Sequence, residues 1–207
     1  MTQALHAAFE FFARGGLFMA LLLVLSIAAL AVILFRAAAL RVNLIFPRDL
    51  ETAVEALQPG ESLENLVFLA KSSPTPLGRI LSVCLEHLRW PRQENVEAVQ
   101  MRARHEIVRM ESGLVLLEVA TGIAPLLGLL GTLSGLVGIF SNIGEGGDPA
   151  AVARGISEAL NTTIVGLAVA VVCLVAYNYF QRKVETMAVS LEGAAADLMA
   201  KCYGAEG

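Results

Sequence analysis

Three runs of apolar residues in this chain are each long enough to cross a lipid bilayer, which takes about 20 residues of helix. The runs occupy residues 15–36, 118–143 and 151–180, and the first two are uncharged except at one end. The third contains Arg154 and Glu158. Of the whole chain, 56% of residues are hydrophobic and 16% are charged, against about 45–50% and 25% in soluble domains. We therefore predict an all-α integral membrane protein with three transmembrane helices.

The basic residues predict how these helices are oriented. Ten of the fifteen Lys and Arg residues lie between Arg36 and the second run, and three follow the third run. Since cytoplasmic loops are enriched in Lys and Arg, we expect segments 37–117 and 181–207 to be cytoplasmic. The N-terminus and the loop over residues 144–150 are then expected on the outer side.

The segments outside the spans are predicted to be helical. Residues 1–14 have the spacing of an amphipathic helix lying at the outer interface, although a frayed terminus is the alternative. Short helices are predicted over residues 49–57, 61–71 and 77–90, with Asp49 as a cap. From Arg92 onward no helix breaker occurs before Gly113, which predicts one long helix running into the second span. The third span is predicted to continue as a helix to about Met199.

Glu158 is the residue in the spans to which we assign chemistry. An ionisable side chain within a span costs a few kcal/mol and usually faces the protein interior or a water-filled cavity. A carboxyl group in that position suits a site that takes up and releases protons. The alternative is that the third span begins later and leaves Glu158 at the interface.

Hydroxyl groups lie close to Glu158 along the predicted helices. Thr162 follows it by four residues and shares its helix face. At 1.5 Å per residue, Thr132 and Thr163 fall within roughly 3 Å of each other in depth. We therefore predict that Glu158, Thr132 and Thr163 line one path. The alternative is that each threonine only bonds a carbonyl of its own helix.

Small residues predict close helix packing in the second span. Four glycines with spacings of three, four and three residues share one face, namely Gly128, Gly131, Gly135 and Gly138. Small residues let helices approach closely in lipid, either within one chain or between copies. Pro125, just before them, is expected to kink the helix.

Several function classes find no motif here. The sequence contains no Walker loop, nucleophile triad or metal-ligand spacing, and no basic patch with interleaved aromatic residues. We therefore expect no enzyme, no cofactor, no metal and no nucleic-acid partner. If the chain drives movement, the energy must come from an ion gradient or from a partner.

Two stretches carry a resemblance to a known family. Residues 124–135, APLLGLLGTLSG, resemble the second-span signature of the ExbB/TolQ/MotA proton-channel family. Residues 155–167, GISEALNTTIVGL, with Tyr177 and Asn178 beyond them, resemble its third-span signature. Three spans fit the ExbB-like branch. The resemblance assigns Glu158 to the family's glutamate, and Thr132 and Thr163 to its two pore threonines.

The resemblance also implies partners and a location. It implies a homopentamer in the bacterial inner membrane around a dimer of a single-span ExbD/TolR-like protein. Proton flow would then drive work through a TonB-like or TolA-like protein, with the N-terminus periplasmic and the C-terminus cytoplasmic.

Three functional alternatives stay open within this prediction. The chain could serve TolQ-like envelope maintenance or a gliding motor instead of transport. It could also be a non-conducting scaffold for the single-span partner. Asn161 stands where the family usually has an aliphatic residue, so Asn161 and Thr162 are candidate pore-adjacent polar residues. Sodium is therefore kept as an alternative ion to the proton.

Overall fold

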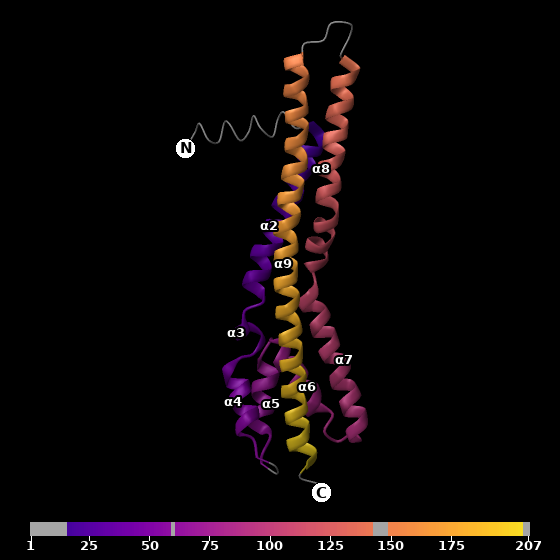
Figure 1. The fold of residues 1–207 in the computed structure, drawn as a ribbon. Helices are drawn as coiled ribbons and strands as arrows, with labels where there is room; N and C mark the ends of the chain where they lie inside the picture. Colours follow the sequence, from indigo (N-terminus) through magenta and orange to yellow (C-terminus); the bar gives the residue numbers. More distant parts are fainter. Residues whose placement is uncertain (1–15, 59–60, 143–148, 205–207) are drawn as a thin grey trace, which may run out of the picture. The chain divides into compact units, whose positions relative to one another are not determined.

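The computed structural model describes residues 16–58, 61–142 and 149–204, which form helices and no strand (Figure 1). The predicted helix over residues 1–14 lies outside these ranges, as does most of the loop predicted over residues 144–150. The chain divides into two units that we describe separately. The membrane unit comprises residues 1–34 and 113–179, and the polar unit comprises residues 35–112 and 180–207.

Three of the described helices are long and apolar enough to cross a membrane, as predicted. They are α2 (Gly16–Ala39), α8 (Leu114–Asn142) and α9 (Pro149–Tyr203). The 55 residues of α9 form one continuous helix, which confirms that the third span extends far beyond its apolar run. Residues of α9 up to Tyr179 belong to the membrane unit, and the remainder belongs to the polar unit.

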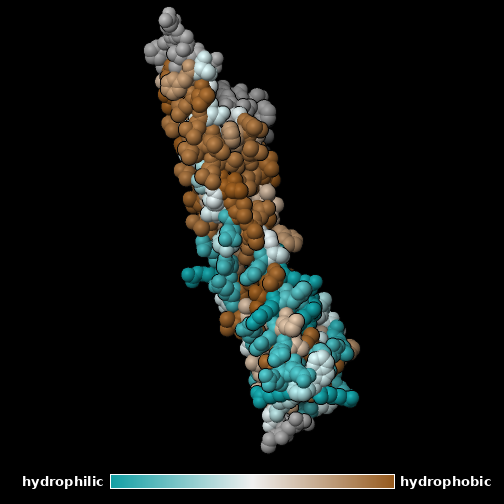
Figure 2. Space-filling model, turned by 90° about the vertical axis from the view of Figure 1, so that its right-hand side faces the viewer, coloured by the Kyte–Doolittle hydropathy of each residue, from teal (hydrophilic) through white to brown (hydrophobic). Residues whose placement is uncertain are grey.

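The core of the membrane unit is built mainly from small side chains. Leu22 of α2, Ala124 of α8 and Ala170 of α9 meet in one buried cluster, and the three helices lie side by side there (Figure 1). Large apolar side chains instead point outward, among them Val24, Val137 and Val175. The face of this unit visible in Figure 2 is accordingly almost entirely hydrophobic. Such a surface is suited to lipid or to a partner helix, because every helical backbone group is satisfied internally.

The polar unit is a cluster of short helices packed around the end of α9. Its helices are α3 (Val42–Ile45), α4 (Arg48–Ala56), α5 (Glu64–Ser72), α6 (Pro76–Glu86) and α7 (Arg92–Glu111). α6 begins where the Thr75 hydroxyl accepts a hydrogen bond from the Gly78 amide and Pro76 occupies the first turn, a favourable helix start. The predicted cap Asp49 is wrong, because α4 begins one residue earlier and Pro47 occupies the cap position.

The predicted continuous helix from Arg92 into the second span is also wrong. α7 ends at Glu111, Ser112 adopts an extended conformation, and Gly113 has a φ of 84° before α8 begins at Leu114. Arg36 stabilises this break from a distant part of the sequence. Its buried guanidinium donates to the Met110 carbonyl over 3.2 Å and to the Ser112 hydroxyl over 2.6 Å. A cation at this place pairs with a free carbonyl group at the C-terminus of α7 and interacts favourably with the helix dipole.

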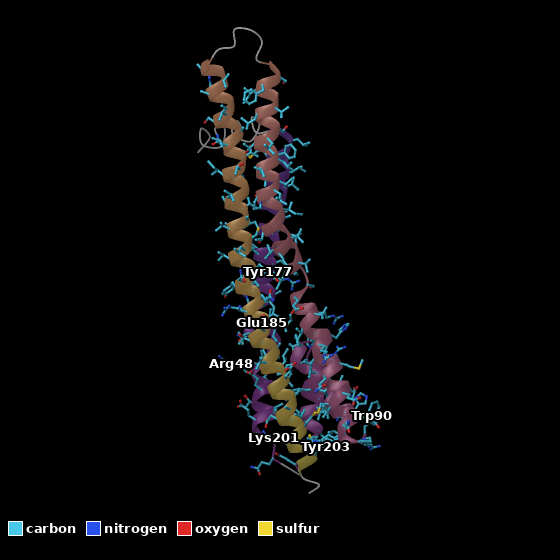
Figure 3. All side chains as sticks on the ribbon, turned by 45° about the vertical axis from the view of Figure 1, so that its right-hand side comes forward. Arg48, Trp90, Tyr177, Glu185, Lys201 and Tyr203 are labelled. Carbon is cyan, nitrogen blue, oxygen red and sulfur yellow. The ribbon has the colours of Figure 1, made fainter. Side chains whose placement is uncertain are left out.

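The last turns of α9 are attached to the other helices of the polar unit by polar contacts (Figure 3). Lys201 donates to the carbonyls of Val54 and Glu55 at 2.7 and 3.0 Å, and so caps the end of α4. The Tyr203 hydroxyl lies 2.9 Å from the amide nitrogen of Asn95, which is fully buried and also bonds the Cys84 carbonyl. These contacts fix where α9 ends.

Candidate functional site

Thr132 of α8 and Thr163 of α9 meet in the membrane unit, and their hydroxyl groups are hydrogen-bonded to each other. Thr132 is buried, and Thr163 is half-buried. This contact agrees with the common depth that counting along the two antiparallel spans predicts.

Both hydroxyls also contact the backbone of the opposite helix. The Thr132 hydroxyl lies 3.1 Å from the Ala159 carbonyl of α9, and the Thr163 hydroxyl lies 3.1 Å from the Gly128 carbonyl of α8. Thr132 additionally lies 3.1 Å from the Gly128 carbonyl on its own helix. The alternative that each threonine bonds only its own helix therefore fails for both residues.

The threonine pair has two possible proton arrangements. In one, Thr163 donates to Thr132, and Thr132 donates to a carbonyl group. In the other, Thr132 donates to Thr163, and Thr163 donates to the Gly128 carbonyl. A hydroxyl has one proton and two acceptor sites, so it can accept a proton on one side while it releases its own on the other. The pair can therefore switch which hydroxyl donates and which one accepts.

Glycines allow the two helices to come close enough for these contacts. A Cβ atom added to Gly128 would lie 3.0 Å from backbone atoms of Thr162 and Thr163, and one added to Gly166 would lie 2.5 Å from the Ala124 carbonyl. A Cβ on Gly131 would collide with the Thr162 methyl group. Interhelical hydrogen bonds in membranes average only about 0.6 kcal/mol. Close packing at these glycines, rather than the hydrogen bonds, therefore decides where the threonines meet.

The other residues of the predicted glycine face are placed as follows. Gly135 also lies at the contact, where an added Cβ would come within 2.9 Å of the Ala159 side chain. A Cβ on Gly138 would meet no atom within 4 Å, so this glycine does not contribute to close packing within the chain. α8 continues through Pro125. Gly166 is a packing residue of α9 that the sequence analysis did not single out, although it follows Thr162 by one helical turn.

The structure gives Glu158 a backbone position in α9, but its side chain lies outside what the structure describes. Five residues separate it from Thr163, which places its Cα about 7.5 Å further along the helix axis. Thr162, four residues after Glu158, is 2% exposed, and Asn161 is half-buried. Among the described residues, no group of three His, Cys, Asp or Glu side chains is arranged to hold a metal ion.

The polar unit contains a buried carboxylate that the sequence analysis missed. Glu106 of α7 is 1% exposed and receives two hydrogen bonds from Arg79 of α6, at 2.9 and 2.5 Å. Arg102 and Arg109 approach the same carboxylate to 3.1 and 3.8 Å from positions four before and three after it. The i, i+3 and i, i+4 spacings were visible in the sequence, but the contact with Arg79 depends on how α6 packs against α7.

The surrounding arginines control the ionisation of Glu106. Burial by itself would raise the pKa of this carboxyl group. The hydrogen bonds from Arg79 and the charges of Arg79, Arg102 and Arg109 outweigh burial, and they hold the pKa below its ordinary value. Glu106 is therefore a fixed negative charge that joins α6 to α7, and it is poorly suited to exchange protons near neutral pH.

Comparison with known proteins identifies sequences similar to this chain. The model of the MotA/TolQ/ExbB proton channel family matches residues 72–193, more than half of the chain. The ExbB-like 1 protein of Synechocystis sp. is 38% identical over 191 residues, covering 86% of this chain and 72% of that protein. The biopolymer transport protein ExbB of Neisseria gonorrhoeae is 31% identical over 153 residues, or 66% of this chain and 70% of that protein.

An archaeal protein is similar over a shorter part of its length. The ExbB homolog of Methanothermobacter thermautotrophicus is 34% identical over 139 residues, which cover 67% of this chain but 50% of that protein. The chain thus spans half the length of this relative. The region matched by the family model includes both threonines and Glu158.

Proposed function

The chain belongs to the MotA/TolQ/ExbB proton channel family, and from this premise we propose that it is the ExbB-like subunit of an inner-membrane motor driven by the proton-motive force. In this proposal a proton crosses the membrane unit by way of Glu158 and the Thr132–Thr163 pair. Three apolar helices and the family membership support the inner membrane as its location.

One observation carries this proposal. Two hydroxyls from different spanning helices are hydrogen-bonded to each other and to each other's backbone, at the position where glycines bring the helices into contact. Packing alone does not require hydroxyl groups there, because valine has nearly the same shape and volume as threonine. A hydroxyl pair with two interchangeable proton arrangements supports a role in proton transfer.

The proposed assembly follows the family. We propose a homopentamer of this chain around a dimer of a single-span ExbD/TolR-like partner, with a TonB-like or TolA-like protein receiving the work. The outward apolar side chains of α2, α8 and α9 offer a surface that both lipid and neighbouring helices can contact. In this arrangement the N-terminus is periplasmic and the C-terminus is cytoplasmic, as the distribution of basic residues favours.

The proposed ion is the proton. Neutral hydroxyls and one carboxyl group can relay protons, and the family whose model matches the chain is a proton channel family. Asn161 is the residue in this region that could change the choice of ion. Replacing proton gradients by sodium gradients in the same assay distinguishes the two ions.

Replacing Glu158 by glutamine tests the proposed function. The Glu158→Gln variant keeps the size and hydrogen-bonding capacity of the side chain but cannot release a proton near neutral pH. We expect it to assemble normally and to lose gradient-dependent work, measured as uptake or envelope function in cells that lack the native subunit. Normal work by this variant would contradict the role of Glu158. Defective assembly in place of defective work would favour the scaffold alternative.

A further inference from the structure

In the polar unit, α7 and α9 each carry a line of exposed residues that recur at intervals of three and four. We refer to the first line as the α7 face, which consists of Met101, Arg104, Val108 and Glu111. The second line is the α9 face, which consists of Arg182, Thr186, Val189 and Gly193. Intervals of three and four keep side chains on one side of a helix, and they are the spacing with which two helices pack against each other.

Large apolar side chains on both faces are unusually exposed. Met101 is 73% exposed, Val108 is 64% exposed and Val189 is 70% exposed. They lie in segments that the distribution of basic residues predicts outside the bilayer, so lipid is not expected to cover them. Apolar residues gathered on one exposed surface mark a site where another protein binds.

Gly193 on the α9 face has no packing role among the described residues. It lies in the interior of α9, where glycine destabilises a helix relative to alanine. A Cβ atom added to it would meet no atom within 4 Å, whereas one added to Gly128 or Gly166 would collide with the facing helix. A large side chain from outside the chain, packed over Gly193, would explain a glycine at this position.

The groove between the two helices shows which of their residues lie at the same level. Its volume is about 410 Å³, and its lining residues fall within 92–104 on α7 and 192–199 on α9. The helices run antiparallel there, since Asn95 near the start of α7 bonds Tyr203 at the end of α9. The middles of the two lining segments, Ala98 and Ala195, therefore lie at about the same level.

This register matches the apolar residues of the two faces. Copies of a chain arranged in a ring within one bilayer sit at the same height, so the levels found within one copy also hold between neighbouring copies. Counting forward on α7 and backward on α9 then brings Met101 level with Gly193, to within one residue. Val108 in the same way comes level with Thr186. The Thr186 hydroxyl is bonded to the Arg182 carbonyl of its own helix, which leaves its methyl group to pack.

The same register brings together two opposite charges. Thirteen residues after Ala98 is Glu111, and thirteen residues before Ala195 is Arg182. Both side chains are exposed, and neither forms an ion pair within the part of the chain that the structure describes. Opposite charges at one level favour this pairing over a shifted one.

We propose that the α7 face of one copy of this chain packs antiparallel against the α9 face of a neighbouring copy. In this contact Met101 lies over Gly193, and Glu111 pairs with Arg182. The two faces are different surfaces, so the contact is head-to-tail and can be repeated around a ring. This inference rests on the proposed assembly of several copies, and it adds the surface that joins them.

Cysteine cross-linking between two separately tagged full-length chains tests the register. One chain carries Met101→Cys or Val108→Cys, and the other carries Gly193→Cys or Thr186→Cys. The chains are expressed together, and their membranes are oxidised with copper phenanthroline. A disulfide needs Cα atoms within about 7 Å, and exchanging partners shifts the two positions by about 10 Å along the helices. We therefore expect position 101 with 193, and 108 with 186, to form mixed disulfides at least about tenfold faster than the exchanged pairs.

The parent chains give the background from their own thiols, Cys84, Cys173 and Cys202. Equal rates for matched and exchanged pairs, no mixed dimer above this background, or a disulfide to a different protein in place of a second copy would overturn the contact.

Exchanging the charges of Glu111 and Arg182 provides an independent test. Glu111→Arg and Arg182→Glu each place like charges opposite each other, so we expect each to lower the assembled fraction severalfold in detergent, measured by size-exclusion chromatography. The double variant restores opposite charges and should return to within about twofold of the parent. Unchanged assembly in both single variants, or no recovery in the double variant, would contradict the pairing.

The contact and the proposed function can fail separately. Matched cross-links together with normal work by Glu158→Gln would keep the contact and contradict only the proposed function. Loss of work in Glu158→Gln without matched cross-links would overturn only the contact.

Discussion

The Thr132 hydroxyl has three oxygen neighbours within hydrogen-bonding distance but carries only one proton to donate. Its hydrogen bonds can therefore be arranged in more than one way. Glu106 in the polar unit is the opposite case, because its carboxylate is held by direct contacts with several arginines. The same chain thus contains one polar contact that can rearrange and one that is fixed by charge.

The fixed contact predicts how stability depends on pH. The folded-state pKa of Glu106 lies below its ordinary value of 4.5, so its stabilising contribution is present above that value and is lost as the pH falls through the folded-state pKa. We expect Glu106→Gln to lose about 2 kcal/mol near neutral pH, less than for a fully buried pair because the arginines stay partly solvated. Below the folded-state pKa, the variant and the parent should converge.

Hydrogen exchange in α6 and α7 of the detergent-solubilised full chain measures this effect. Glu97→Gln is the matched control, because Glu97 is an exposed carboxylate on the same helix. Equal protection of α6 and α7 in the Glu106→Gln variant and the parent near neutral pH would contradict this account of Glu106.

At the scale of helices, close packing of α8 against α9 depends on particular glycines. Gly166→Ala would place a methyl group 2.5 Å from the Ala124 carbonyl and 3.0 Å from the Gly128 Cα. Backbone atoms cannot move aside as a flexible side chain can, so we expect a loss of about 1–3 kcal/mol and separation of the threonine hydroxyls. Gly122→Ala on α8 is the control, since its Cβ would meet no atom within 4 Å. Thermal unfolding in detergent compares the two, and equal midpoints would contradict the packing account.

Helices were the scale at which sequence reasoning succeeded and failed most clearly. Long apolar runs predicted α2, α8 and α9, and the absence of breakers after residue 180 predicted the extension of α9. The same reasoning missed the break between α7 and α8. That break depends on the positive φ of Gly113 and on Arg36, which reaches the end of α7 from more than 70 positions earlier in the chain. A local pattern contains no signal for such a contact.

For the candidate site, the sequence predicted the depth of each residue along its helix but not the direction in which its side chain points. Counting residues placed Thr132 and Thr163 at one level, and the structure brings their hydroxyls together. The crossed bonds to Gly128 and Ala159 depend on how the helices rotate about their axes. That rotation is decided by glycines on both helices, including Gly166, so one helix face read alone could not reveal it.

At the scale of the whole molecule, α9 is the element that both units share. Its membrane part carries Glu158 and Thr163, and its last turns bond to α4 through Lys201 and to Asn95 through Tyr203. α9 therefore carries both the proposed ion pathway and the contacts that hold its last turns within the polar unit.

Proton flux through the assembled complex, reconstituted in vesicles with its single-span partner, tests the central claim most directly. Thr132→Val and Thr163→Val keep the shape of the side chains but remove the relay, whereas Thr132→Ser and Thr163→Ser keep the hydroxyls. We predict at least about a tenfold loss of flux in each valine variant. This loss is no larger than the smallest effects typical of removing a proton-transfer group. The serine variants should stay within about twofold of the parent. Parental flux in both valine variants would contradict a proton path through Thr132 and Thr163.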